Sequence, residues 1–372
     1  MQKLVFSRAT PVVLFLAVCF GSVAADDLAT NSLLASQTRA FDSQLAPMSL
    51  HTSGKKVLNA GGKRVWLYGV NIASLEWSTD GEHVEESVNR AINDWKVNLI
   101  RLPLAQDHWF GKRTNQMDGG AAYRALVDRL VDTCAAGRVY IDLDLHWSDC
   151  GRWMNEGGTL GQHSMPDKNS IVFWQDLATR YKNRPNVIFD LYNEPHDVSF
   201  AIWRDGGTVT NNPEHKKPGQ AKVVYEAVGM QRLYDTVRAT GATNIVAVGG
   251  LDWAYDLSGI LRGYGIKGQN LIYETHPYQN KKNWDKNFGD PSWKYPVYVG
   301  EWGFSARATN GLGYAQSLMQ YVRKHKLPWT AWDMHVTAGP PLIKNWDYEP
   351  TVCGQFVKEQ LAAAAAARGP NK

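Results

Sequence analysis

The amino-acid sequence predicts an α/β fold, specifically a closed (β/α)₈ TIM barrel. Short apolar runs alternate with amphipathic stretches along most of the chain, eight such runs can be counted, and no two-residue hairpin turn joins them. Strands that are separated by helices pair in parallel. Eight strand-helix units in about 310 residues fit one closed barrel. A doubly wound open sheet is the structural alternative.

The expected strands are rich in Val, Ile and Leu and end in polar residues. In chain order they span residues 65–71, 97–104, 139–146, 187–194, 244–250, 271–276, 297–301 and 329–333. Between them, apolar residues recur with the 3.6-residue period of a helix packed on one face. This period predicts helices over residues 85–95, 121–135, 170–181, 223–239 and 313–324, and a last helix from about residue 351.

The N-terminus has the pattern of a secretory signal. Lys3 and Arg8 precede an apolar run over residues 11–20, and small residues follow around position 25. This pattern is typical of a signal peptide, and the run is too short to span a membrane comfortably. We therefore expect cleavage after residue 25 and a secreted protein, extracellular or periplasmic, with no membrane attachment after the signal is removed.

The remaining chain divides into three parts. Residues 26–50 consist mainly of small residues, polar residues and Leu, without a sustained hydrophobic period. We expect them to be a flexible N-terminal segment. Residues 51–361 carry the alternating pattern and are expected to form the barrel domain. Residues 362–372 are an Ala-rich tail, which can extend a last helix before it frays.

Charge and cysteine content exclude some classes of partner. Removal of Lys3 and Arg8 takes the formal charge from +4 to +2, because residues 1–25 contain no acidic residue. Such a balance, without a dense basic run, gives no reason to expect a nucleic-acid partner. Cys134, Cys150 and Cys353 remain after the signal is lost, so one disulfide with a free thiol and three thiols are both open. Their spacing does not fit a zinc site, and we expect no metal.

Polar residues gather at the carboxyl ends of the predicted strands, where (β/α)₈ barrels place their active sites. A single strand-end Glu or His is more often a solvated or structural residue. Here six strands bring such groups to one rim, and this coincidence favours a functional site. The rim residues include Arg101, His146, Trp147, Asn193, Glu194, His276, Tyr278, Glu301, Trp302 and Trp332. Asp142, Asp144, Asp190 and Glu274 lie deeper, and we interpret them as an interior polar network.

Two carboxylates facing each other across a barrel mouth suit the cleavage of a glycosidic bond. One carboxylic acid protonates the leaving oxygen, and the other group meets the positive charge that develops at the anomeric carbon. At a separation of about 5 Å the second carboxylate can attack directly, and the configuration is retained. Its negative charge raises the pKa of its partner, which keeps that partner protonated until the attack.

The motifs around these carboxylates resemble those of glycoside hydrolase family 5, the cellulase family. Asn193-Glu194-Pro195 follows an apolar strand, and Glu301 lies in Val-Gly-Glu-Trp-Gly, residues 299–303. The similarity runs from about residue 56 to residue 361. It includes, in the family's order, Arg101, His146, Asn193, Glu194, His276, Tyr278, Glu301 and Trp332.

This resemblance implies a retaining (β/α)₈ enzyme that needs no cofactor. Glu194 would be the acid/base and Glu301 the nucleophile, while Asn193 would bind the sugar 2-hydroxyl. Arg101 and Tyr278 would hold Glu301 ionised and oriented. His146 and His276 would complete the network around the sugar, and Trp332 would form the floor of its subsite.

The aromatic content agrees with a carbohydrate substrate. The chain has 15 Trp residues, and flat rings at strand ends can stack on sugar faces. Trp77, Trp147, Trp153, Trp253 and Trp302 are the candidates for this role. We expect a monomeric endo-β-1,4-glucanase (cellulase) that acts on β-glucan. A β-mannanase or xylanase of the same family is the nearest alternative, and a non-hydrolysing polysaccharide-binding protein is the alternative from another class.

Overall fold

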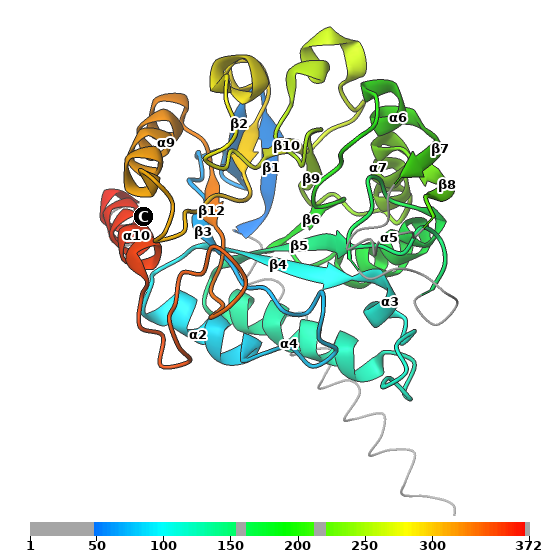
Figure 1. Ribbon diagram of the computed structural model, residues 1–372, viewed down its shortest axis with the longest axis horizontal. Coiled ribbons are helices and arrows are strands. Elements are labelled where there is room, and N and C mark those ends of the chain that lie inside the picture. The colour runs from blue at the N-terminus through cyan, green and yellow to red at the C-terminus, as the bar shows by residue number, and fades with distance from the viewer. Residues whose placement is uncertain (1–47, 154–160, 212–220, 369–372) are drawn as a thin grey trace, which may run out of the picture. The chain divides into compact units, whose positions relative to one another are not determined.

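The computed structural model describes residues 48–153, 161–211 and 221–368 (Figure 1). Among these residues, eight strands close into a parallel barrel in the order β3, β4, β5, β6, β9, β10, β11, β12. The predicted (β/α)₈ fold is thereby confirmed, and the open-sheet alternative is excluded. The barrel strands are β3 (Tyr68–Asn71), β4 (Leu99–Ala105), β5 (Tyr140–Trp147), β6 (Val187–Asp190), β9 (Val246–Gly249), β10 (Leu271–Thr275), β11 (Val297–Val299) and β12 (Trp329–Ala331).

Alternation along the strands separates an apolar layer from a polar centre. On β5, Leu143 and Leu145 alternate with Asp144 and His146, and all four are buried. Successive side chains of a strand point to opposite faces, so a barrel strand with this pattern packs its apolar face against the helices and turns the acidic face inward. In the parallel register, Asp144 pairs with Asp190 of β6. The interior polar network predicted from the sequence is therefore confirmed as a buried cluster.

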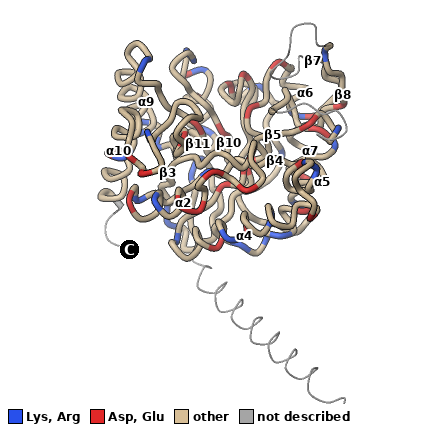
Figure 2. Tube along the Cα trace, turned by 60° about the horizontal axis from the view of Figure 1, so that its bottom comes forward, with Lys and Arg blue, Asp and Glu red and all other residues tan. Residues whose placement is uncertain are grey.

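Helices surround the barrel on the outside (Figure 1). The longer ones are α2 (Val84–Asn93), α4 (Ala121–Ala136), α5 (Lys168–Tyr181), α7 (Met230–Ala239), α9 (Gly311–His325) and α10 (Val352–Arg368). Basic and acidic residues are interspersed along α4 and α5 (Figure 2), and Arg180 of α5 pairs with Asp128 of α4. Shorter helical segments are α3 (Gln106–Trp109), α6 (Phe200–Asp205), η3 (Ile260–Tyr264), η4 (Asp285–Gly289) and α8 (Asp290–Ser292).

The predicted helix over residues 223–239 is wrong in its first half. Residues Val223–Val228 form strand β8, which pairs antiparallel with β7 (Gly206–Asn211), and only Met230–Ala239 is helical. Tyr225 and Ala227 are buried while Glu226 between them is exposed, which is the period of a strand. β-branched and aromatic residues in this segment also favour the strand.

A hairpin that the sequence did not predict precedes the barrel. It consists of β1 (Leu50–Ser53) and β2 (Lys56–Asn59), and the backbone N–H of Thr52 donates a 3.1 Å hydrogen bond to Oδ1 of Asn270. Met48 and Leu50 are buried, so the expected flexible segment, residues 26–50, extends too far at its C-terminal end. At the other end of the chain, α10 continues into the Ala-rich tail as far as Arg368.

Two other expectations concern the termini and the cysteines. The expected signal peptide, residues 1–25, lies outside the described residues. Within the described part of the chain, no helix is long and apolar enough to cross a membrane. Cys134, Cys150 and Cys353 are buried free thiols, which decides between the two possibilities that the sequence left open.

Candidate active site

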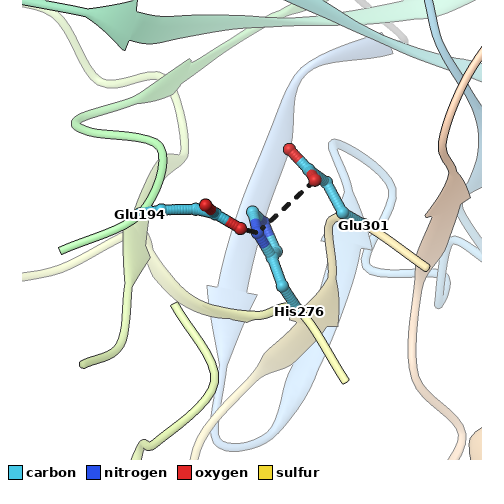
Figure 3. Close-up of side chains that lie close together, drawn as sticks. All are labelled: Glu194, His276 and Glu301. Carbon is cyan, nitrogen blue, oxygen red and sulfur yellow. Dashed lines mark hydrogen bonds and ion pairs between the residues drawn. The ribbon is translucent and has the colours of Figure 1, made fainter. Parts of the chain in front are cut away.

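Glu194, His276 and Glu301 meet at the carboxyl ends of the barrel strands (Figure 3). They follow β6, β10 and β11 by four, one and two residues respectively. Nδ1 of His276 lies 2.9 Å from Oε1 of Glu194 and 3.7 Å from Oε2 of Glu301. Oxygens of the two carboxylates lie within 4.8 Å of each other. The histidine therefore sits between two acidic groups from different strands.

Glu301 is held at both of its oxygens. Nη1 of Arg101 donates a 2.8 Å hydrogen bond to Oε1, and the phenol of Tyr278 donates a 2.9 Å bond to Oε2. The side chain is 5% exposed. Hydrogen bonds to a carboxylate favour its ionised form, and a guanidinium adds charge stabilisation. The contacts implied by the resemblance for Arg101 and Tyr278 are both present.

Arg101 is the centre of the buried polar network. Its guanidinium has no solvent exposure, and a buried charge of this kind needs paired charges and hydrogen bonds around it. The carboxylates raise its pKa despite the opposing effect of burial. Its partners besides Glu301 are Asn71 (3.1 Å), Asn193 (2.9 Å), Asp190 (2.9 Å), Asp144 (3.1 Å) and Glu274 (3.1 Å).

His276 lies between carboxylates on both sides. Burial alone would lower its pKa, but the charge of Glu301 and the hydrogen bonds to Glu194 and Glu274 raise it to about 10. Its second nitrogen, Nε2, lies 3.1 Å from Oε1 of Glu274. The imidazolium thus has an acceptor at each nitrogen. Burial would raise the pKa of Glu194, yet the hydrogen bond and charge of His276 outweigh burial and lower it. The expectation that the charge of Glu301 raises the pKa of its partner is therefore wrong for this site.

Asn193 determines the protonation of His146. Its Oδ1 accepts from Nη2 of Arg101, so its Nδ2 faces Nε2 of His146 at 3.1 Å. Burial lowers the pKa of His146, but Asp144, 2.6 Å from Nδ1, raises it to about 9. A pKa of about 9 would leave the His146 ring doubly protonated at neutral pH. The N–H of Asn193 that faces Nε2, however, requires this nitrogen to accept a hydrogen bond and to carry no proton. Because the guanidinium of Arg101 can only donate hydrogen bonds, it fixes the orientation of the Asn193 amide. We therefore assign a neutral imidazole to His146, with its proton on Nδ1.

Aromatic rings border the carboxylates. Trp332 stacks on His146, with ring centroids 5.4 Å apart and an interplanar angle of 19°. Trp77 and Trp147 are half-buried, and their ring centroids lie 6.5 Å apart. The indole N–H of Trp77 donates a 2.8 Å hydrogen bond to Oε1 of Glu82. Trp332 follows β12, Trp77 follows β3 and Trp147 ends β5. Strands β12 and β3 are neighbours in the barrel, and β4 lies between β3 and β5.

The other three tryptophans predicted to stack on sugars differ in their surroundings. Trp253 is 41% exposed and stacks on His196, with ring centroids 4.6 Å apart at 6°. Trp153 is half-buried against Phe110. Trp302 is fully buried, so the expectation that it stacks on sugar is wrong. Its indole packs edge-on against Trp329 and Phe356, on the side of the barrel wall that faces α10.

Three further polar residues lie at the rim, and two of them, Glu76 and Gln162, were not predicted from the sequence. Glu76 is buried and accepts a 2.8 Å hydrogen bond from the backbone of Ser74, and burial raises its pKa to about 7. Asp333, joined to Trp332 by a cis peptide bond, has two buried carboxyl oxygens without a hydrogen-bond partner among the described residues. Burial, with the charges of Glu76 and Glu301, raises its pKa. The third is Gln162, which contacts Asn193.

One group of described side chains could supply three ligand atoms to a metal ion, namely Glu194, His276 and Glu301. The three atoms already interact with one another or with neighbours in the site. The guanidinium of Arg101 also lies 2.8 Å from Glu301, and its positive charge opposes a cation there. The arrangement suits proton transfer and nucleophilic attack by side chains.

Comparison with known proteins identifies the family. The sequence model of the family described as cellulase (glycosyl hydrolase family 5) matches residues 58–337. Endoglucanase N of Pectobacterium atrosepticum and endoglucanase 5 of Pectobacterium carotovorum subsp. carotovorum are each 23% identical over an alignment of 330 residues that covers 83% of this chain. The chain spans 64% and 57% of the lengths of these two curated relatives.

Solved structures agree on the fold. The β-glucanase SdGluc5_26A from Saccharophagus degradans, in complex with cellotetraose, matches with a TM-score of 0.66 and 23% sequence identity, covering 85% of this chain and 94% of that chain. Fold and site together define a (β/α)₈ barrel with facing carboxylates at the carboxyl ends of its strands. The chain belongs to glycosyl hydrolase family 5, the cellulase family. The resemblance inferred from the motifs is confirmed.

Proposed function

We propose that the protein is a secreted, retaining endo-β-1,4-glucanase with Glu194 as acid/base and Glu301 as nucleophile. The observation that carries this proposal is the pair of carboxylates, whose oxygens lie within 4.8 Å of each other in a family 5 barrel. Retaining glycosidases have their carboxyl groups about 5 Å apart, whereas inverting enzymes leave room for a water at larger separations. The names of the matched relatives, both endoglucanases, support a β-1,4-glucan substrate.

In the first step, an ionised oxygen of Glu301 attacks the anomeric carbon. The bond from this carbon to the glycosidic oxygen breaks as that oxygen takes a proton from Glu194, and the leaving chain departs as an alcohol. Arg101 and Tyr278 hold Glu301 ionised until it attacks. Asn193 is placed to bind the sugar 2-hydroxyl, a contact that strengthens in the transition state.

In the second step, Glu194 takes a proton from water, which attacks the anomeric carbon and releases Glu301. The lowered pKa of Glu194 suits this base role. For the acid role, Glu194 needs a proton. His276 can donate one, because its Nδ1 lies 2.9 Å from Oε1 of Glu194. One proton is shared by the pair: it rests on Nδ1 of His276 in the free site and moves to Glu194 as the glycosidic oxygen approaches.

The aromatic rings supply the binding surface for the polysaccharide. Trp332 forms the floor beneath the sugar that is cleaved, and Trp77 and Trp147 continue the surface along the rim. Trp253 is exposed beside His196, and its backbone N–H donates a hydrogen bond to the carbonyl of Pro195, so it offers a platform on the side of Glu194. We propose that the enzyme works as a monomer without metal or organic cofactor, because side chains can perform both steps.

A panel of soluble polysaccharides tests the proposal. Reducing-sugar release is measured with a soluble cellulose derivative, mixed-linkage β-glucan, xylan and mannan as separate substrates. The proposal predicts hydrolysis of the two glucans. Activity on mannan or xylan alone would keep the catalytic pair and replace the substrate. Binding to a glucan without any hydrolysis would instead indicate a polysaccharide-binding protein.

A further inference from the structure

Gln162 joins the two adjacent polar residues that follow strand β6. Its Oε1 accepts a 2.6 Å hydrogen bond from Nδ2 of Asn193, and its Nε2 donates to the backbone carbonyl of Glu194. The residue comes from a different part of the chain, the connection between β5 and α5, and is 4% exposed. A single buried amide therefore contacts both the proposed ligand of the 2-hydroxyl and the proposed acid/base.

The segment that carries Gln162 is anchored by phenols. Tyr192 donates to the carbonyl of His163 and accepts from its N–H, at 2.5 and 3.1 Å. Tyr225 makes the same pair of contacts with Met165, at 2.9 and 3.0 Å. Because these anchors lie next to Gln162 on buried backbone, its side chain approaches Asn193 from a fixed direction. Such support keeps a polar side chain in its working geometry.

Gln162 also completes the orientation of the Asn193 amide. Oδ1 of Asn193 accepts from Arg101, and Nδ2 is shared between His146 and Gln162. On the basis of the proposed function, we propose that Gln162 is a positioning residue, which acts on the reaction by holding Asn193 for the 2-hydroxyl of the sugar that is cleaved. Loss of its amide would free Asn193 to rotate and would remove a donor from the carbonyl of Glu194.

A substrate that lacks the 2-hydroxyl separates this role from a structural one. The kcat/KM is measured for an aryl β-cellobioside and for its analogue without the 2-hydroxyl on the ring that bears the aryl group. Gln162→Met keeps the length of the side chain and removes both hydrogen bonds. It should lower kcat/KM about tenfold on the first substrate and less than about twofold on the second. Gln175→Met, at an exposed position of α5, is the matched control.

The outcomes are distinct. An equal loss on both substrates, or no loss on either, would overturn the role of Gln162. A wild type that cleaves neither substrate would instead overturn the proposed function. In the background of Asn193→Ala, Gln162→Met should cause little further loss, because the two residues act as a unit.

Melting temperatures show whether Gln162→Met is folded. A second variant keeps the test valid if it is not. Gln162→Glu retains the acceptor for Asn193 and the shape of the side chain, and it loses only the donor to the carbonyl of Glu194, which affects both substrates alike. It should therefore keep the wild-type ratio of kcat/KM between the two substrates. A ratio that falls toward that of Asn193→Ala would reject the proposal.

Discussion

Nη1 of Arg101 donates a 2.8 Å hydrogen bond to Oε1 of Glu301, and the guanidinium that makes this bond is completely buried. The same guanidinium pairs with Asp144, Asp190 and Glu274 below the site. One cation therefore joins the proposed nucleophile to the acidic interior of the barrel. We therefore expect substitutions of Arg101 to affect both the stability of the barrel and the proposed reaction.

Arg101→Met should destabilise the protein by about 3–5 kcal/mol at neutral pH, because it leaves buried carboxylates without their cation. These carboxylates can take up protons, so the loss should become smaller as the pH falls. Urea unfolding at pH 5 and pH 8 measures both effects. Arg129→Met, which breaks an exposed pair with Glu85, is the control and should cost less than about 1 kcal/mol. A pH-independent loss would count against the pairing.

His276→Gln should change the alkaline limb of the pH profile. In the wild type the shared proton is lost only as the pH rises through the raised pKa of His276, about 10. The alkaline limb of kcat/KM should therefore lie well above neutral pH. The variant leaves Glu194 as the sole holder of the proton, and its limb should move to lower pH. An unchanged limb would show that the acid proton does not come from His276.

Glu76 should make stability depend on pH. Its pKa is raised from an ordinary value of 4.5 to about 7, so the folded state keeps a proton that the unfolded state releases. The contribution of this group to the free energy of unfolding is complete below pH 4.5. It falls by about 3 kcal/mol as the pH rises to 7. Glu76→Gln cannot ionise and should lack this component. Parallel stability curves for wild type and variant between pH 4.5 and 7.5 would refute the assignment.

Trp253 and Trp302 should respond in opposite ways to truncation. Trp302→Ala removes a fully buried indole and should cost about 3–5 kcal/mol of stability. Trp253→Ala removes a ring that is 41% exposed and should weaken cello-oligosaccharide binding with little change in melting temperature. Calorimetric unfolding and titration with cellotetraose test the pair. Wild-type affinity in Trp253→Ala would remove this residue from the binding surface.

The barrel and the shared rim could be predicted because both depend on short-range patterns, whereas the contacts of Arg101 and Tyr278 with Glu301 were implied by the resemblance to family 5. Strand ends meet at one rim of a parallel barrel, so Arg101, Glu194 and Glu301 could be brought together from their positions alone. The same alternation could have excluded Trp302. Neighbours on an extended segment face opposite sides, and a Glu301 that points inward sends the next side chain outward.

Other features depend on contacts that no local pattern records. Gln162 reaches Asn193 because Tyr192 and Tyr225 anchor the segment that carries it, and both phenols lie far along the chain. Strand β8 was missed because an apolar, helix-like period over residues 223–239 concealed a two-residue alternation before Gly229. Long-range partners therefore decided the details of the site.

Trapping of the covalent intermediate would identify the nucleophile. A 2-deoxy-2-fluoro-β-cellobioside with a good leaving group is incubated with the wild-type enzyme, and the labelled peptide is mapped by mass spectrometry. We expect one 2-deoxy-2-fluorocellobiosyl adduct, on Glu301, and none in Glu301→Gln. An adduct on Glu194, or steady hydrolysis of the unmodified cellobioside by Glu301→Gln, would contradict the assignment of Glu301 as the nucleophile.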